Sequence, residues 1–297
     1  MTVYYKISAP AKLNLNLFVK AKSENGLHFL ESDICFLELI DKIYLKFSQD
    51  DTFHQNKKNS FLINPKKNLI LQAINQFRFH TNWDKKFEIY VDKNIPIGSG
   101  LGGGSADAAA TLVLLRTLFN KNKNNNKMPI SKILQIGSEL GSDVPSCIIS
   151  KDLRLSGYGK EIKRKKFPSN YYFFIIYPNI ELSTKSVFQH YSVFKNLNHK
   201  SKKILFENII IHNSLLLPAT SLAPKIKDVL IILRKIPNIV AYGMTGSGST
   251  CFGIVKCSKD IPNLGKLFNN EYFIWFGQKA NFNLNRVSFS KVLENKF

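Results

Sequence analysis

Residues 95–110 read Ile-Pro-Ile-Gly-Ser-Gly-Leu-Gly-Gly-Gly-Ser-Ala-Asp-Ala-Ala-Ala, and this segment is the most informative part of the sequence. Five glycines fall between positions 98 and 104, the strand-like stretch Phe87–Val91 precedes them, and Ser105–Phe119 follows as a strong predicted helix. Glycine lets backbone amides approach a ligand without a Cβ in the way. Free amides at a helix start, added to the helix dipole, attract anions, so the segment predicts a phosphate-binding loop.

Other glycine-rich phosphate loops fit this segment less well. Gly98-x-Gly100-x-x-Gly103 matches the dinucleotide fingerprint, but residues 120–123 (NKNK) supply no acidic residue for a ribose about 20 positions later. A Walker A loop requires lysine at position 104, which is glycine, and the His-Arg-Asp and Asp-Phe-Gly strings of protein kinases are absent. A purely structural glycine loop is the remaining alternative, and five glycines beside an unbroken helix argue against it.

A polar row is predicted on the first strand. Residues 13–19 alternate between apolar and polar side chains, which is the period of a strand with one buried face. Lys12, Asn14 and Asn16 then project on the same side. A row of solvent-facing side chains is the simpler interpretation, but asparagine is unfavourable in strands, and two of them beside a lysine suggest a lined site.

The remaining elements are predicted from apolar periodicity. In the first half these are a β-rich stretch with a break near Asp41-Lys42, a helix, a second helix with Ser131 as N-cap and Gly141 after its end, and a strand: residues 34–47, 68–79, 131–140 and 146–149. In the second half they are a buried strand, three helical stretches, and a strand that follows a second glycine-rich turn at 243–248: residues 171–177, 184–194, 202–217, 221–235 and 250–255.

Length and composition predict two mixed lobes. The chain has 297 residues and is 44% hydrophobic, which is enough for a large core. Residues 156–169 (SGYGKEIKRKKFPS) are rich in glycine and charge, so we expect an N-terminal nucleotide-binding lobe at 1–155 and a C-terminal lobe at 156–297. No run of about 18 apolar residues suggests a membrane span, and no signal peptide is recognised, so a cytoplasmic location is expected.

The net charge of +21 raises the alternative of a nucleic-acid-binding protein. The excess is mostly lysine and is spread along the chain with asparagine and isoleucine, so we favour a generally basic surface. The four cysteines, Cys35, Cys147, Cys251 and Cys257, form no C-x-x-C pair and do not cluster with the histidines. A zinc site is therefore not expected.

Several strings together resemble one kinase family. The glycine loop resembles the phosphate loop of the superfamily of galactokinase, homoserine kinase, mevalonate kinase and phosphomevalonate kinase (GHMP kinases). Residues 9–15 (APAKLNL), 141–145 (GSDVP) and 244–248 (MTGSG), with 68–70 and 92–96, are similar to the 4-diphosphocytidyl-2-C-methyl-D-erythritol kinases of non-mevalonate isoprenoid synthesis. The resemblance implies an α+β fold of two lobes with the active site in the cleft between them.

The resemblance also implies roles for individual residues. Lys12 and Asp143 would be the catalytic pair, and the 2-hydroxyl of the methylerythritol unit would be the acceptor. ATP would bind with Mg²⁺, Ser105 being a candidate metal contact, and Asn68 and Lys93 would lie near the adenosine. The loop residues expected to contact ATP are Pro96, Ile97, Gly98, Ser99, Gly100, Leu101, Gly102, Gly103, Gly104, Ser105 and Ala106. The residues expected to contact the substrate are Asn14, Leu27, His28, Thr184, Phe188, Thr245, Gly246 and Ser247.

The implied chemistry is consistent with the residue types. A tertiary alcohol is a very weak acid, so a carboxylate such as Asp143 can accept its proton late in the transfer, and Lys12 can keep that carboxylate ionised. A helix-exit aspartate and a surface lysine are the alternatives. The family usually has Gly-Tyr-His where this chain has Gly26-Leu27-His28, and Asn-Asp-Leu where it has Asn213-Ser214-Leu215. These departures concern the recognition of cytidine.

Three rival interpretations stay open at the level of sequence. The first is a related kinase for another alcohol, homoserine or mevalonate. The second is a basic RNA-binding protein of related fold, and the third is an enzyme that binds nucleotide without turnover. Small-molecule substrate and ATP are the expected partners, with a monomer or weak homodimer as the expected assembly.

Overall fold

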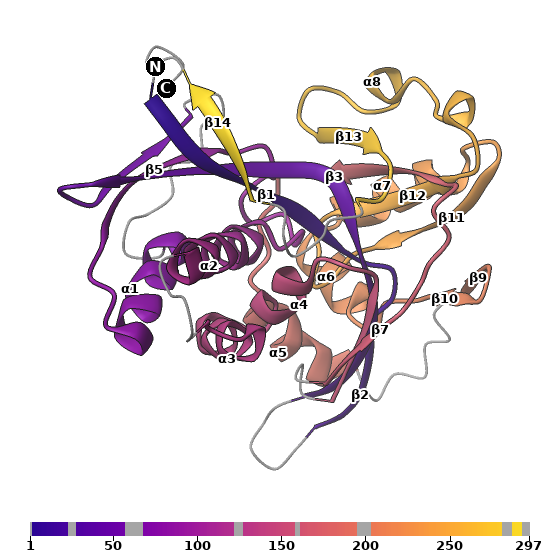
Figure 1. Cartoon of the computed structure of the whole chain (residues 1–297). Helices are drawn as coiled ribbons and strands as arrows, with labels where there is room; N and C mark the ends of the chain where they lie inside the picture. Colours follow the sequence, from indigo (N-terminus) through magenta and orange to yellow (C-terminus); the bar gives the residue numbers. More distant parts are fainter. Residues whose placement is uncertain are drawn as a thin grey trace.

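The computed structural model describes residues 2–22, 28–56, 68–121, 127–157, 161–194, 203–280 and 287–292. Within these ranges the chain forms two large sheets, with helices packed against each of them, and a separate two-stranded hairpin (Figure 1). This mixed architecture confirms the expected α+β class. Among the helices of these ranges, none has the length and apolar character needed to cross a membrane.

The first sheet is built around one long strand. β3 (His28–Ser48) pairs with β1 (Thr2–Asn14) on one side and with β5 (Lys86–Asp92) on the other. The order is β14-β1-β3-β5-β4, in which β4 (Thr52–Gln55) runs parallel to β5 and β14 (Ser288–Val292) returns from the end of the chain. Three short strands extend the sheet beside the beginning of β3: β2 (Phe18–Lys22), β6 (Leu153–Ser156) and β7 (Glu161–Arg164).

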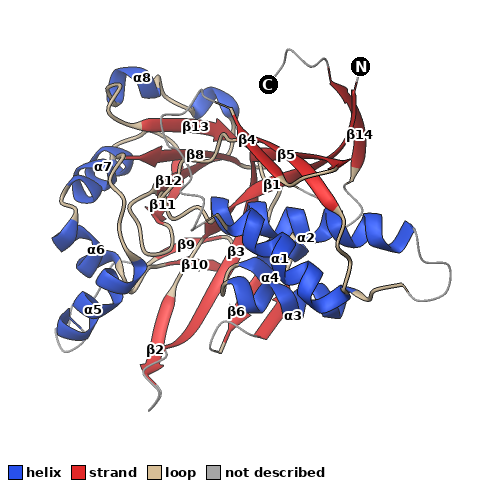
Figure 2. Ribbon diagram, turned by 90° about the vertical axis from the view of Figure 1, so that its left-hand side faces the viewer, coloured by secondary structure: helices blue, strands red, loops and turns tan. Residues whose placement is uncertain are grey.

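Four helices cover one face of this sheet (Figures 1 and 2). They are α1 (Leu69–Thr81), α2 (Gly103–Lys121), α3 (Ile130–Leu140) and α4 (Val144–Ile149). The central helix is α2, whose alanine- and leucine-rich run is buried on nearly every side, against α1, β1 and α4. The Asn68 side chain caps α1 by accepting a hydrogen bond from the Ile70 amide at 2.9 Å, which stabilises the helix start.

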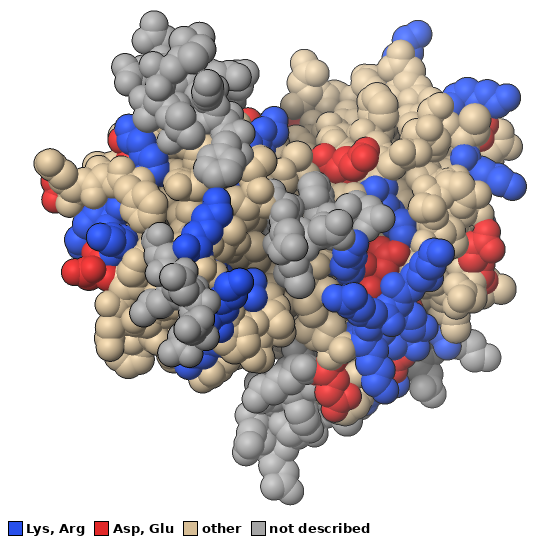
Figure 3. Space-filling view, in the orientation of Figure 1, with Lys and Arg blue, Asp and Glu red and all other residues tan. Residues whose placement is uncertain are grey.

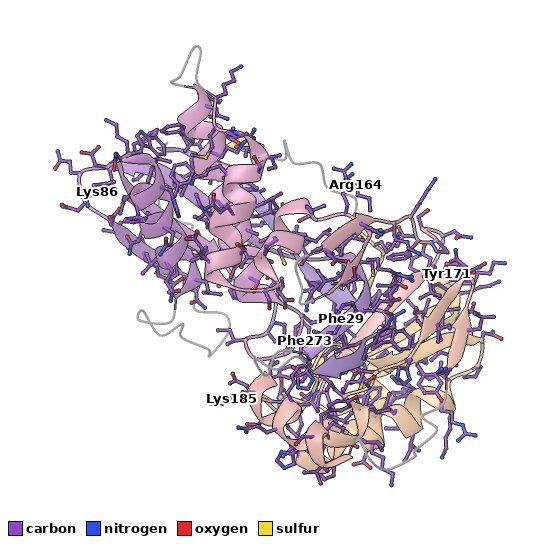
Figure 4. All side chains as sticks on the ribbon, turned by 90° about the horizontal axis from the view of Figure 1, so that it is seen from below. Phe29, Lys86, Arg164, Tyr171, Lys185 and Phe273 are labelled. Atoms are coloured by element: carbon purple, nitrogen blue, oxygen red, sulfur yellow. The ribbon has the colours of Figure 1, made fainter. Side chains whose placement is uncertain are left out.

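The second sheet has the order β11-β12-β8-β13 and is antiparallel throughout. Its strands are β8 (Tyr172–Tyr177), β11 (Ile239–Met244), β12 (Cys251–Val255) and β13 (Phe273–Gly277). The accompanying helices are α5 (Thr184–Phe194), α6 (Leu216–Leu222), α7 (Lys225–Arg234), η2 (Ser258–Asp260) and α8 (Leu264–Leu267). Figure 4 shows the two lobes from below, with Lys86 in the outer part of one and Tyr171 on the other.

The two lobes share a hydrophobic core. Apolar side chains of β1 and β3 pack with those of β8 and β12 in one buried cluster, which includes Leu13, Leu37, Ile175 and Phe252. A separate cluster fills the space between the first sheet and its helices, and a third lies between the second sheet, α6 and α7. Because the middle cluster contains residues from both sheets, packing at the centre of the molecule couples the two lobes.

Several local predictions were wrong. Residues 202–217 contain a hairpin of β9 (Ile204–Phe206) and β10 (Ile209–Ile211) in place of a helix, because β-branched isoleucines dominate that stretch. Residues 146–149 belong to α4, since Pro145 in the first turn favours a helix start. Helix α3 begins after Pro129, and Ser131 does not cap it.

The predicted strand at 13–19 is also divided. β1 ends at Asn14, and the chain leaves the strand before β2 begins at Phe18. The Asn16 side chain bonds Asp33, with its Nδ2 donating to Asp33 Oδ2 at 3.0 Å and its Oδ1 accepting from the Asp33 amide at 2.7 Å. These side-chain bonds replace strand pairing at this point. Lys12, Asn14 and Asn16 are all buried, at 4–5% exposure, so they form no solvent-facing row.

The expected lobe boundary at 155 falls inside β6. β6 and its partner β7 both belong to the first sheet, and β14 brings the end of the chain back to it. We therefore propose that the lobes divide after Arg164, with β14 as a returning strand of the first lobe.

Basic side chains occur on both lobes of the face in Figure 3, with the densest group near the position of β7. The four consecutive residues Lys163, Arg164, Lys165 and Lys166 are exposed in β7 and the segment after it. The high net charge is therefore carried by the surface in general, with one local concentration outside the cavity described below.

A buried ionic cluster explains why β3 continues through Asp41-Lys42 without the predicted break. Lys93 Nζ lies 2.5 Å from Asp41 Oδ2 and 2.7 Å from Asp107 Oδ2, and all three side chains are at most 3% exposed. Asp41 Oδ1 also accepts hydrogen bonds from the amides of Asn94 and Ile95, at 2.5 and 2.8 Å. The cluster thereby fixes the start of the glycine loop and the first turns of α2 to β3.

The charges of this cluster depend on one another. Burial alone would lower the pKa of Lys93, but the carboxylates of Asp107 and Asp41 outweigh it and raise that pKa, so the ammonium stays charged. Burial and then the Asp41 charge raise the pKa of Asp107, against the pull of Lys93. A carboxyl group whose pKa is higher in the folded than in the unfolded state contributes most to stability below its unfolded-state pKa of about 3.9. This contribution is lost as the pH rises through the folded-state pKa.

We predict that Lys93→Met lowers the free energy of unfolding by roughly 3–5 kcal/mol at pH 7, because two buried carboxylates lose their counter-charge. The deficit should shrink at pH 5, where protonation of Asp107 relieves the repulsion. Urea unfolding followed by circular dichroism at both pH values measures it. Lys46→Met is the control: its partly exposed pair with Glu88 should contribute less than about 1 kcal/mol. A loss that is equal at both pH values would contradict this account.

Candidate active site

A cavity of about 850 Å³ lies where the two lobes meet. One side is formed by the glycine loop, the end of β1 and the start of α1. The other side is formed by residues 181–184, Phe188 of α5, Leu215 and the second glycine-rich turn at Gly246-Ser247. The cavity is large enough for a small-molecule ligand and is lined by side chains and backbone of both lobes.

The glycine loop has a backbone that requires glycine at three positions. Gly98, Gly100 and Gly102 have φ angles of +71°, +79° and +68°, which residues with a Cβ rarely adopt. Helix α2 begins at Gly103, two residues before the predicted start, and the first intrahelical bond runs from the Ala106 amide to the Gly102 carbonyl at 2.8 Å. The amides at this helix start are therefore available to an anion at the cavity wall.

The second glycine-rich turn packs directly on the first. A Cβ on Gly100 would lie 2.5 Å from the carbonyl oxygen of Gly248. The Thr250 hydroxyl donates to the Ser99 carbonyl at 2.5 Å, and Ser99 Oγ donates to the Pro96 carbonyl at 2.7 Å. These contacts fix the two loops against each other from opposite lobes.

Lys12 and Asp143 meet at the inner end of the glycine loop. Lys12 Nζ lies 2.8 Å from Asp143 Oδ2, and the Lys12 side chain is 6% exposed while that of Asp143 is 34% exposed. The Lys12 amide donates to the Leu101 carbonyl at 2.9 Å, and its Cε lies 3.2 Å from the place of a Cβ on Gly102. Asp143 precedes α4 as its N-cap residue. A carboxylate and an ammonium group thus face each other beside the phosphate-binding amides.

A buried polar network lies behind this pair. Asn14 Nδ2 donates to Ser32 Oγ at 2.7 Å, and Ser32 Oγ donates to the Asn16 carbonyl at 2.5 Å. Asp33 is bound by both Asn16 and the guanidinium of Arg154, whose Nε and Nη2 each donate at 2.7 Å. Sequence reasoning missed Ser32, Asp33 and Arg154. The contacts of Ser32 and Asp33 with Asn14 and Asn16 span 16 to 18 positions, and those of Arg154 with Asp33 span 121, so no local pattern marks any of the three.

Three buried polar atoms at the cavity have no hydrogen-bond partner within the described part of the chain. They are Oδ1 of Asn14, Nδ2 of Asn68 and Oδ1 of Asp107, and all three residues line the cavity. A buried donor or acceptor without a partner is unfavourable. Each is therefore suited to bind a polar group of a ligand.

The residues expected to contact the substrate divide into those that line the cavity and those that do not. Phe188 lines the cavity, and the His28 ring stacks on it with 4.9 Å between centroids and 28° between planes. Gly246, Ser247 and Thr184 also line the cavity, and the Thr184 and Ser247 hydroxyls are 3.0 Å apart. Thr245 lies behind the surface, where its hydroxyl accepts from the Asn14 amide at 2.8 Å. Leu27 lies outside the described residues.

Some residues expected to contact ATP also make contacts within the protein that stabilise the fold. Lys93 is held by Asp41 and Asp107, and the Asn68 side chain caps α1 with its oxygen. Leu101 and Ala106 are fully buried and do not line the cavity, whereas the other loop residues from Pro96 to Ser105 do. The departure at Asn213-Ser214 lies beside the second turn: Asn213 Nδ2 donates to the carbonyls of Met244 and Gly246, both at 2.8 Å.

Comparisons with known proteins show the family of the chain. Models described as "GHMP kinases N terminal domain" and "GHMP kinases C terminal" match residues 68–151 and 194–283. The 4-diphosphocytidyl-2-C-methyl-D-erythritol kinase of Prochlorococcus marinus (strain MIT 9301) is 30% identical, covering 91% of this chain and 93% of that protein. The kinase of the same name from Ruthia magnifica is 32% identical, covering 85% and 86%.

Solved structures show the same fold. A crystal structure of 4-(cytidine 5'-diphospho)-2C-methyl-D-erythritol kinase superposes with a TM-score of 0.75 at 24% identity, covering 93% of this chain and all of that one. Homoserine kinase from Cytophaga hutchinsonii superposes with a TM-score of 0.64 at 16% identity, covering 98% of each chain.

We predict that Gly100→Ala separates the two glycine loops. The new Cβ would meet a backbone carbonyl at 2.5 Å in a residue with φ of +79°, so the variant should lose about 1–3 kcal/mol of stability. Binding of a nucleoside triphosphate should weaken by roughly tenfold or more, because the loop amides shift. Thermal unfolding and titration calorimetry measure the two effects.

Gly104→Ala is the matched control for stability. A Cβ at position 104 would have Leu69 Cδ1 as its nearest atom, at 3.5 Å, and its φ is not positive. Its stability should stay within about 0.5 kcal/mol of the unaltered chain. Equal effects of the two substitutions would show that contact between the loops does not matter.

Proposed function

The chain belongs to the 4-diphosphocytidyl-2-C-methyl-D-erythritol kinases, a family of GHMP kinases, and on this premise we propose how its cavity performs phosphoryl transfer. It is an ATP-dependent kinase of the non-mevalonate isoprenoid pathway. We infer that the γ-phosphoryl group of ATP is transferred to the 2-hydroxyl of 4-diphosphocytidyl-2-C-methyl-D-erythritol. One observation supports this site above others: the Lys12–Asp143 pair lies against Gly102 of the phosphate-binding loop.

In this proposal Asp143 is the general base. Its carboxylate accepts the proton of the acceptor hydroxyl as the new oxygen–phosphorus bond forms, and the bond between the β-γ bridging oxygen and the γ-phosphorus breaks. The partial exposure of Asp143 leaves room for the hydroxyl to reach it, whereas Lys12 is nearly fully buried. The Lys12 ammonium holds the carboxylate in place through their 2.8 Å contact and lies where it can offset charge on the transferred group.

We propose that the glycine-loop amides and the start of α2 bind the triphosphate of ATP. Mg²⁺ prefers oxygen ligands and usually keeps several waters and phosphate oxygens. The donors at the cavity fit that preference, since the hydroxyl of Ser105 and the carboxylates of Asp143 and Glu181 all line it. We assign Ser105 to hold the ion, which when bound neutralises charge on the β- and γ-phosphates.

Substrate recognition is assigned to the opposite half of the cavity. The stacked rings of Phe188 and His28 offer a flat aromatic surface for a pyrimidine base. The hydroxyls of Thr184 and Ser247 and the turn at Gly246 suit a diphosphate group, and Asn14 Oδ1 is an acceptor for a hydroxyl of the methylerythritol unit. We further propose the cytoplasm as the site of action.

An ATP-consumption assay with three acceptors tests the substrate assignment. We expect kcat/KM for 4-diphosphocytidyl-2-C-methyl-D-erythritol to exceed those for homoserine and mevalonate by at least about a hundredfold, because buried polar groups of the site stay unpaired with the wrong alcohol. Preference for either of the other alcohols would overturn the substrate. Nucleotide binding with no turnover on any of them would indicate an inactive relative.

We predict that Asp143→Ala lowers kcat by about 10²–10⁴ while ATP still binds, since the base acts on the acceptor and not on the nucleotide. Steady-state kinetics and titration calorimetry measure the two properties. Glu139→Gln, in the preceding helix and paired with His80 at the surface, is the control and should keep normal turnover. Near-normal kcat in the Asp143 variant would remove Asp143 from the mechanism.

A further inference from the structure

Residues 178–183 connect β8 to α5 and lie along both glycine-rich loops; we call them the connecting segment. Ser249 Oγ donates to the Ile180 carbonyl at 2.5 Å. Leu182 Cδ1 lies 3.3 Å from the place of a Cβ on Gly248. The connecting segment therefore brings side chains of the second lobe to the phosphate-binding loop of the first.

Glu181, in the middle of the connecting segment, rests on the glycine loop itself. A Cβ on Gly98 would lie 2.6 Å from both Cγ and Cδ of Glu181. Tyr177 stands nearby: its hydroxyl donates to the Ile97 carbonyl at 3.4 Å, and burial, followed by the charge of Glu181, raises the pKa of Tyr177. The absence of a side chain at Gly98 thus leaves room for a carboxylate at the wall of the cavity.

Glu181 differs from the other carboxylates of the cavity. Asp107, Asp143 and Glu181 line it, and the first two are neutralised by Lys93 and Lys12. Across the described residues, Glu181 makes neither an ion pair nor a side-chain hydrogen bond.

An unneutralised carboxylate beside a triphosphate site has a defined electrostatic consequence. It repels the oxygens of a free triphosphate, because both carry negative charge. A divalent cation between them reverses the sign of that interaction and accepts carboxylate oxygen as a ligand. The position of Glu181 therefore favours the nucleotide with its cation over the nucleotide alone.

We propose that Glu181 makes the site selective for metal-complexed ATP, by attracting the divalent cation of the nucleotide and repelling uncomplexed triphosphate. The inference rests on the proposed function, since it requires ATP to bind the glycine loop. It assigns to the second lobe a direct electrostatic part in nucleotide binding.

Titration calorimetry with ATP, without acceptor, tests the proposal in excess Mg²⁺ and in EDTA. Glu181→Gln should weaken binding in Mg²⁺ by about two- to fivefold and tighten binding in EDTA by a similar factor, because solvent screens the charge of an exposed carboxylate. Glu181→Asp keeps the charge and should retain most of the selectivity. Glu38→Gln removes an exposed carboxylate that does not line the cavity and should change neither affinity.

The direction of the two changes decides the outcome. A purely structural role of Glu181 would shift both affinities the same way, and that result would overturn the proposal while leaving the kinase function intact. Unchanged affinities in both conditions would overturn it equally. If the unaltered chain bound no ATP in either condition, the proposed function would fail, and this inference with it.

Discussion

Backbone lies against backbone where the two glycine-rich loops meet, and the rest of the site depends on this close approach. Gly100 leaves no room for a Cβ beside the Gly248 carbonyl, and Thr250 bonds Ser99 across the same contact. Only residues without side chains let two lobes come together at this distance. The contact closes the cavity on one side and places the phosphate-binding amides next to the end of β1, where Lys12 lies.

Charge at the cavity is arranged in layers. Deepest is the cluster of Lys93, Asp41 and Asp107, which fixes the glycine loop and α2 to β3 and is at most 3% exposed. Above it lies the pair of Lys12 and Asp143, in which the acid stays partly accessible. Glu181 lines the wall and makes no ion pair among the residues that the structure describes. The accessible acids are thus those for which chemistry or ion binding is proposed, while the inaccessible ones stabilise the framework.

Local sequence signals predicted the elements where periodicity was strong. The buried strand at 171–177, the helix at 68–79 capped by Asn68, and the helix at 184–194 all occur within a residue or two of the predicted bounds. Prediction failed where two signals competed. The apolar pattern of the isoleucine-rich stretch 204–211 predicted a helix, but the stretch forms a hairpin. A strand break was predicted at Asp41 because the local sequence does not show its buried partner, Lys93, which lies 52 residues away.

The sequence by itself determined the phosphate-binding loop, the kinase family and the residue types of the candidate site, because glycine content, helix spacing and short motifs are local properties. Only the tertiary structure decided which side chains meet. The 2.8 Å contact between Lys12 and Asp143, the approach of Glu181 to Gly98 and the bonds from Arg154 to Asp33 join distant positions. Such contacts follow from packing two sheets around a shared core, a non-local balance that no single segment encodes.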